Sequence, residues 1–177
     1  TIKSLIDIKN RKEKNSSMKA LAYQLYENNG VLKREQVSEY LKNLGQNERK
    51  ILRDLGVKFG RYHVFLHRLI KPDAVSLRTL LWKNYNQKNF TLKPPTFGLN
   101  FLDNNKIKDK NFMLLCGFEK FENFFIRIDI LERLFVQIIN SSSEKEKQVK
   151  MMPEMLNLLG CNKENFKKLL KSMNYIV

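Results

Sequence analysis

Basic residues alternate with apolar and aromatic residues between positions 49 and 93. Eleven Lys and Arg stand there against two Asp, so this segment carries +9 of the chain's formal net charge of +15. Like charges at this density destabilise a compact chain unless an anion offsets them, and a phosphate backbone is the commonest large anion for a soluble protein. A base composition rich in Lys codons is the alternative. Five of the eleven residues are Arg, which such a bias does not produce and which suits bidentate phosphate contacts.

The expected contact residues fall into two groups. Arg61, Tyr62, Arg68, Lys71 and Arg78 form the first group, and Lys167, Lys168 and Lys171 form the second. In the first group the cations would contact phosphates, and the ring of Tyr62 would stack on an unpaired base. Most aromatic residues nearby are expected to fill the core instead. The lysines of the second group follow the outward face of a predicted helix over 163–173, which is alternatively an ordinary solvated face.

Other kinds of chemistry find little support in the sequence. His63 and His67 are four residues apart in a strand-like segment, and no Cys, Asp or Glu nearby completes a metal-ligand set. The run from Gly56 to Arg61 has the wrong length and order for a phosphate-binding loop. No Ser, His and Asp constellation can be argued. We therefore expect no catalytic residue and no metal in this chain.

The periodicity predicts mostly helices with a short hairpin in the first half. Helical spacing of apolar residues marks segments 18–28, 33–43 and 47–55. After Gly56 the pattern alternates, which predicts two short strands around Gly60-Arg61. Pro72 then opens a helix, residues 73–85, with a broad apolar face. The apolar residues of that helix are Val75, Leu77, Leu80, Leu81 and Trp82.

The expected fold is mainly α with short β-strands, in two small helical lobes. The divisions are a basic tether 1–17, a first lobe 18–86, a linker 87–111 around Pro94-Pro95, and a second lobe 112–177. The second lobe resembles a helix-turn-helix or winged helix, because helices 153–159 and 163–173 flank the turn Gly160-Cys161-Asn162. Its last residues, 175–177, would be the first strand of a wing.

Length and composition indicate the size of the core and the cellular compartment that we expect. Its 177 residues can bury one core or two small ones, and no apolar run is long enough to span a bilayer. Cys116 and Cys161 have no partner at ligand spacing, which fits a reducing compartment. The first residues do not read as a secretory signal, and we expect a cytoplasmic protein that does not contact a membrane. The first residue is not Met, and we expect a piece of a longer protein.

One string of residues carries a family resemblance. Leu52 to Leu66, followed by Leu69-Ile70-Lys71-Pro72 and then Leu77 to Trp82, closely resembles the C-terminal region of alphaproteobacterial superfamily-two RNA helicases. These are DEAD/DExH-type proteins related to the mitochondrial degradosome helicase. His67 stands where that pattern has proline. The resemblance implies that the ATPase, with its ATP and Mg, belongs to upstream RecA-like domains that this chain does not contain.

The sequence therefore predicts a non-catalytic accessory domain of an ATP-dependent RNA helicase. Its partners would be RNA, with single strands favoured, together with the helicase motor and a ribonuclease or ribosome. The alternative is a protein-docking module that links the helicase to a ribonuclease or ribosomal partner, with the basic charge serving solubility. A free-standing transcriptional regulator would need a dimer on duplex DNA, and no dimerisation helix is evident.

Overall fold

The fold is mainly α-helical with short β-strands, as predicted. A computed structural model describes residues 16–86, 92–103, 109–141 and 148–176, together with residues 3, 6, 7 and 10. The chain divides into two compact units, Thr1–Val75 and Ser76–Val177. Most of the predicted tether 1–17 lies outside the described residues. Each unit is described by itself.

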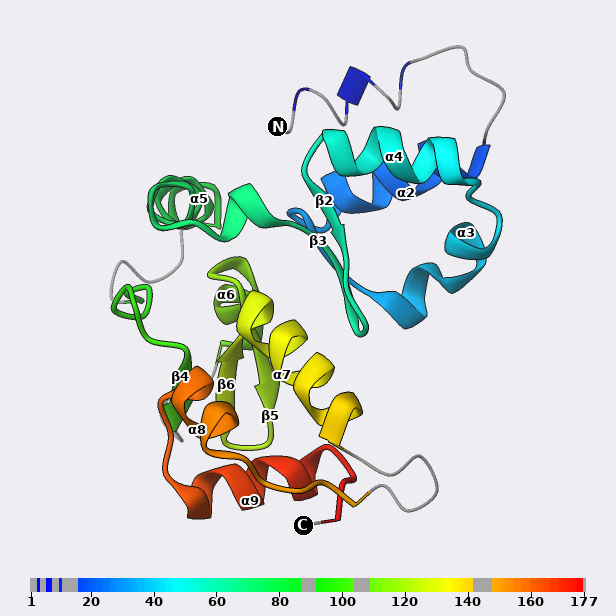
Figure 1. The fold of residues 1–177 in the computed structure, drawn as a ribbon. Coiled ribbons are helices and arrows are strands. Elements are labelled where there is room, and N and C mark those ends of the chain that lie inside the picture. The colour runs from blue at the N-terminus through cyan, green and yellow to red at the C-terminus, as the bar shows by residue number, and fades with distance from the viewer. Residues whose placement is uncertain are drawn as a thin grey trace. The chain divides into compact units, whose positions relative to one another are not determined.

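From residue 16 onward, unit 1 combines three α-helices with a three-stranded antiparallel sheet (Figure 1). Its elements are α2 (Ser16–Glu27), β1 (Val31–Lys33), the 3-10 helix η1 (Arg34–Val37), α3 (Ser38–Lys42), α4 (Gln46–Asp54), β2 (Val57–Phe59), β3 (His63–Leu66) and the 3-10 helix η2 (His67–Ile70). The sheet order is β1-β3-β2. Helix, strand, helix, helix, strand and strand in this order is the connectivity of a winged helix, a helix-turn-helix followed by a hairpin.

The predicted helix over 33–43 is wrong in its first part. Lys33 ends strand β1, and residues 34–37 form η1 before α3 begins at Ser38. The predicted hairpin around Gly60-Arg61 is confirmed by the pairing of β2 with β3.

The core of unit 1 lies between the helices and one face of the sheet. Antiparallel partners share a sheet face, and the pairs Leu32 with Val64 and Val57 with Leu66 place four apolar side chains together. From the helices, the buried apolar residues are Met18, Leu21, Ala22 and Leu25 of α2, Leu41 of α3 and Leu52 of α4. The position of the hairpin therefore depends on helix packing.

Unit 2 repeats a three-stranded sheet and adds a helical C-terminal part. Its elements are α5 (Pro72–Asn86, of which Ser76 onward belongs to this unit), β4 (Phe101–Asp103), α6 (Lys110–Leu115), β5 (Phe118–Phe121), β6 (Phe124–Arg127), α7 (Ile128–Ser141), α8 (Pro153–Leu159) and α9 (Lys163–Ser172). The sheet order is β4-β6-β5, all antiparallel. Buried residues of α7, α8 and α9 pack on Phe124 and Ile126 of the sheet.

The division between the units differs from the predicted one. The expected linker 87–111 contains β4, which pairs with the central strand β6 and is part of the second sheet. Most of α5 also belongs to unit 2, since the ring of Trp82 lies 5.5 Å from that of Phe112. Trp82 therefore does not fill the core of the first lobe.

The two sheets have matching connections, so unit 2 repeats the arrangement of unit 1. After the central strand, the N–H of Leu66 donates to the carbonyl of Gly30 at 2.8 Å, and the N–H of Arg127 donates to that of Asn100 at 3.0 Å. A glycine with positive φ precedes each hairpin, Gly56 at 92° and Gly117 at 86°. In each unit a helix runs into this glycine, α4 in one and α6 in the other.

The C-terminal helices form as predicted, and the last residue of the predicted wing strand, Val177, lies outside the described residues. Asn162 caps α9, because its side chain accepts a hydrogen bond from the N–H of Asn165 at 2.8 Å. Gly160 ends α8 in the left-handed conformation with φ 70°. Ile176 makes a single parallel bridge to Gln148 and is not in a wing hairpin.

Replacing Gly56 tests whether its positive φ fixes the entry of the hairpin. A Cβ at this position meets nothing within 4 Å, so the cost of Gly56→Ala is backbone strain alone, about 1–2 kcal/mol. Gly56→Asn should cost less, because Asn tolerates the left-handed region. Urea unfolding measures both free energies. Equal stability of the Ala variant and the unaltered protein would contradict the strained turn.

Candidate nucleic-acid interface

The helix-turn-helix of unit 1 is held closed by one arginine. The turn between α3 and α4 has three residues, 43–45, and contains Gly45. Arg49 of α4 reaches back over it: its Nε donates to the carbonyl of Leu44 at 3.2 Å and its Nη2 donates to that of Leu41. The Leu41 carbonyl lies in the last turn of α3 and the Leu44 carbonyl in the turn that follows, so Arg49 supplies donors to carbonyls that lack a partner within the helix. Arg49 thereby fixes the direction of α4, the helix in the recognition position.

A second arginine holds the hairpin turn. The backbone N–H of Arg34 donates to the carbonyl of Tyr62 at 2.7 Å, and its Nη1 donates to the carbonyl of Gly60 at 2.7 Å. Within the turn, the N–H of Gly60 donates to the carbonyl of His63 at 2.8 Å. The chain on both sides of Arg61 is therefore anchored to η1, which presents the two turn residues to solvent.

Exposed cations follow these two anchored elements. Lys50 and Arg53 are exposed on α4, Lys58 on β2 and Arg61 in the hairpin turn, where Tyr62 is 39% exposed. We call these five residues the helix-hairpin surface. The guanidinium of Arg53 lies 5.8 Å from the ring centroid of Phe59, which links the end of α4 to β2. Cations held on anchored elements lose little conformational freedom on meeting a phosphate.

The predicted contact residues of the first group do not all lie in one place in the structure. Arg61 and Tyr62 lie in the hairpin turn, while Arg68 on η2 and Lys71 before α5 are exposed elsewhere in the chain. Arg78 differs, because it belongs to unit 2 and is half-buried. Desolvation lowers the pKa of its guanidinium to about 10. We do not place Arg78 in the same site.

Cys116 and Arg78 lie close enough for each to influence the pKa of the other. Burial raises the pKa of the Cys116 thiol to about 12, with the charges of Arg78 and Lys83 opposing the shift. Burial also raises the pKa of Cys161, to about 11. Both thiols are therefore protonated at neutral pH, which is typical of structural rather than reactive cysteines.

The second group of predicted residues lies on α9 in unit 2. Lys167, Lys168 and Lys171 are exposed there, and the opposite face of the helix buries Phe166, Leu169 and Leu170 as predicted. They belong to a different unit from the hairpin, and we describe them as a separate basic face.

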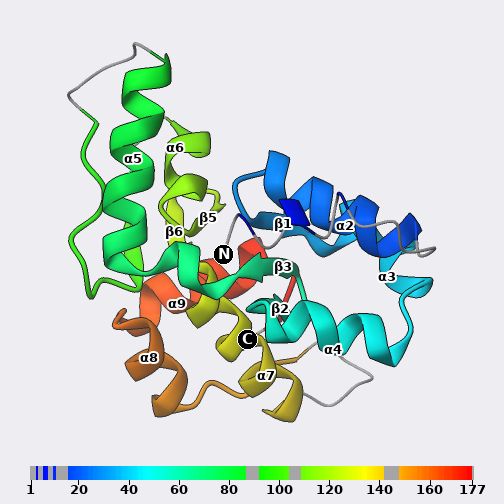
Figure 2. The same cartoon turned by 90° about the horizontal axis from the view of Figure 1, so that it is seen from above.

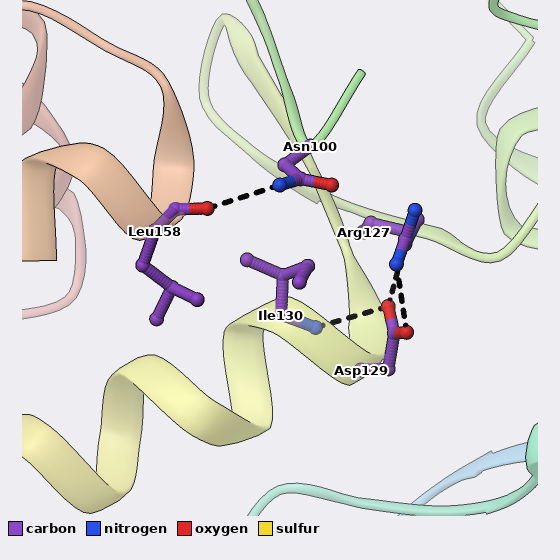
Figure 3. Close-up of polar contacts among 5 residues, drawn as sticks. All are labelled: Asn100, Arg127, Asp129, Ile130 and Leu158. Carbon is purple, nitrogen blue, oxygen red and sulfur yellow. Dashed lines mark hydrogen bonds and ion pairs between the residues drawn. The ribbon is translucent and has the colours of Figure 1, made fainter. Parts of the chain in front are cut away.

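The hairpin of unit 2 offers a comparison within the same chain. Residues 57–66 contain two basic residues and no carboxylate, whereas residues 118–127 contain two of each. In the turn, Glu122 and Asn123 occupy the positions of Arg61 and Tyr62. Arg127 is held by Asp129, with N–O distances of 2.7 and 2.9 Å (Figure 3).

That ion pair is tied into the fold of unit 2. Asp129 also accepts a hydrogen bond from the N–H of Ile130 at the start of α7, and Asn100 donates to the carbonyl of Leu158 at 3.0 Å (Figure 3). Arg127 therefore serves the start of α7, and its charge is already balanced.

Three residues of the helix-hairpin surface were not predicted. Lys50, Arg53 and Lys58 counted toward the basic segment, but nothing singled them out. The signal that could have found them is Gly45 between two helical segments, which has the same spacing as the turn at Gly160.

Other kinds of site find no support in the described parts of the chain. Among those residues no group of three or more His, Cys, Asp or Glu could hold a metal ion. Within the same residues, no helix has the length and apolar character needed to cross a membrane. No family model, curated protein or solved structure matches the chain.

Arg49→Met should destabilise unit 1. The substitution keeps most of the apolar stem but removes the donors to Leu41 and Leu44, at a cost of about 1–3 kcal/mol. Lys50→Met is the matched control, since Lys50 is exposed, and it should change the free energy of unfolding by less than about 0.5 kcal/mol. Urea unfolding checks both. Equal effects of the two substitutions would rule out a special role for Arg49.

Proposed function

We propose that unit 1 is a nucleic-acid-binding module that contacts single-stranded RNA through the helix-hairpin surface. The observation that carries the proposal is the contrast between the two units, which share a backbone arrangement but not a charge pattern. Lys58 and Arg61 in one hairpin correspond to Glu119 and Glu122 in the other. A codon bias toward Lys would act on both hairpins, so it does not explain the difference.

The connectivity of unit 1 supports the same proposal. In helix-turn-helix proteins the second helix and adjoining elements approach the nucleic acid, and backbone contacts set the orientation. Here α4 is that second helix, and it exposes Lys50 and Arg53. Arg49 and Arg34 hold α4 and the hairpin turn through hydrogen bonds to backbone carbonyls.

Tyr62 favours a single strand over a duplex. An aromatic side chain that is exposed next to a cation can stack on an unpaired base, which a duplex does not offer without distortion. Tyr62 follows Arg61 in the turn, so one short segment supplies both a phosphate contact and a stacking ring.

The wider setting that we propose is a cytoplasmic RNA helicase. It rests on the resemblance of the segment from Leu52 to Pro72 to the C-terminal region of superfamily-two helicases. In that setting the chain is a non-catalytic accessory region that holds RNA for the motor, and ATP and Mg belong to the motor domains. A ribonuclease or the ribosome would be a further partner.

Charge reversal at the hairpin tests the RNA contact. Lys58→Glu with Arg61→Glu should lower affinity for a short single-stranded RNA. The slope of log K against log salt should fall by about 1.4, because each of the two phosphates that is no longer neutralised accounts for about 0.7. Fluorescence anisotropy over a salt series measures both, with duplex DNA alongside.

The matched control carries the same change in net charge on unit 2. Arg133→Glu with Lys150→Glu alters two exposed residues outside the proposed surface. An equal fall of affinity in this control would show that the net charge alone attracts the RNA. Preference for duplex DNA would contradict the single-strand proposal.

Tyr62→Ala should weaken RNA binding without changing the salt slope. Removal of one stacked base costs about 1–3 kcal/mol, and stacking releases no counterions. Tyr62→Phe keeps the ring and should bind nearly as tightly. Tyr26→Ala is the control, because Tyr26 on α2 has a similar exposure, 40% against 39%. A changed slope, or an equal effect at Tyr26, would argue against stacking.

A further inference from the structure

Helix α5 turns its apolar face outward. Leu77, Leu80 and Leu81 are 58%, 55% and 58% exposed, and Tyr85 is 89% exposed. They stand at helical spacing and form a stripe along one side of the helix. We call these four residues the α5 stripe. Its length is about 12 Å, at 1.5 Å per residue.

The opposite side of α5 buries polar groups. Thr79 is 3% exposed, and its hydroxyl donates to the carbonyl of Ser76 at 3.0 Å. Arg78 is half-buried with a lowered pKa, and the ammonium of Lys83 lies 6.0 Å from the ring centroid of Phe112. A surface helix ordinarily buries its apolar stripe. Here Trp82, which packs on Phe112, and Thr79 face the rest of unit 2, and the leucines do not, so the described residues of unit 2 do not account for the leucines.

Exposed apolar residues are concentrated in this part of the sequence. Of the twelve large apolar residues that are exposed in the described parts of the chain, six fall between residues 77 and 99. Besides the α5 stripe they are Phe97 and Leu99, on the segment that runs alongside α5 (Figure 1 and Figure 2). Single exposed apolar residues are ordinary, whereas a contiguous group marks an interaction surface.

We propose that the α5 stripe is a docking site for an acidic amphipathic helix of another protein. Leucines at i, i+3 and i+4 are the anchors by which two helices pack, and a stripe of this length matches about two turns of a partner.

Charge selects the kind of partner. Residues 76–93 of unit 2 contain Arg78, Lys83, Lys88 and Lys93 and no carboxylate, which is a net +4. Lys93, after α5, is exposed. A second copy of this chain would bring another +15 to the interface and be repelled, while carboxylates flanking an apolar stripe would be attracted. The stripe shares no residue with the helix-hairpin surface, so the proposal does not rest on RNA binding.

The experiment uses a designed helical peptide with leucines at i, i+3, i+4 and i+7 and glutamates on both flanks. Binding to the full chain is measured by calorimetry and mapped by amide chemical-shift changes. We expect shifts on α5 and at least a tenfold fall of affinity in the variant Leu80→Ser with Leu81→Ser. The matched control is Val136→Ser with Ile139→Ser, which removes two exposed apolar residues from α7.

The comparison peptides separate the outcomes. A peptide with Lys in place of the flanking Glu should bind at least tenfold more weakly, and one with Ser in place of Leu should not bind. Equal binding of the acidic peptide to both serine variants, or shifts confined to α4 and the hairpin, would overturn the proposal by showing attraction to the general basic surface.

Two further measurements detect any other occupant of the stripe. A dimer in sedimentation analysis that the Leu80→Ser, Leu81→Ser variant abolishes would identify a second copy as the occupant and overturn the acidic partner. A fall of several degrees in Tm for that variant alone would show that the stripe is covered within the chain, which also overturns it. The Arg61→Glu variant should bind the acidic peptide as well as the unaltered chain does.

Discussion

The central strand of each small sheet is the constraint on which the rest of the structure depends. β3 pairs with β1 on one side and β2 on the other, and all four of its residues are buried. The C-terminal end of β3 is fixed by the hydrogen bond that the N–H of Leu66 donates to the carbonyl of Gly30. Its N-terminal end is fixed by the hairpin turn. A shift of one residue would replace Val64 and Leu66 in the core of unit 1 by His63 and Phe65, so the core also fixes the register. The exposed turn at Arg61 is thereby held by the core.

The same strand arrangement occurs in both units, so a comparison of the units distinguishes features that the fold requires from features that belong to a binding site. The glycine before the hairpin, the two-residue turn and the bond back to the first strand occur in both units, so they belong to the fold. Charge on the hairpin does not recur, since Arg61 is matched by Glu122. Features that differ between two copies of one backbone are not needed to build it. The basic charge on the hairpin of unit 1 is therefore a stronger indication of a binding role than the net charge of the chain is.

Short sequence signals predicted most of the helices and the first hairpin. The strands that were not predicted are defined by pairing with residues distant in the sequence. The turn chemistry at Gly60-Arg61, Pro72 and Asn162 predicted the hairpin and two helix starts, because each acts through neighbouring backbone. Strands β1 and β4 have three residues each and no periodicity, so only their pairing with a distant strand defines them. The helix-turn-helix spacing of α8 and α9 was predicted from the turn at Gly160. That of α3 and α4 was overlooked, because residues 33–37 were predicted as part of one helix. Two of the eight predicted contact residues, Arg61 and Tyr62, lie on the helix-hairpin surface.

In helix α5 the sequence periodicity predicts which residues share a side of the helix, but not whether that side is buried or exposed. The leucines at 77, 80 and 81 do share a side, as their spacing predicts, yet the buried side is the one with Arg78 and Thr79. Burying a guanidinium and exposing leucines both cost free energy in an isolated unit. Unit 2 offsets the first cost by packing Trp82 on Phe112 next to the buried polar groups. The described residues of unit 2 do not offset the second, and this exposed apolar stripe is the observation behind the proposed docking of a partner helix on α5.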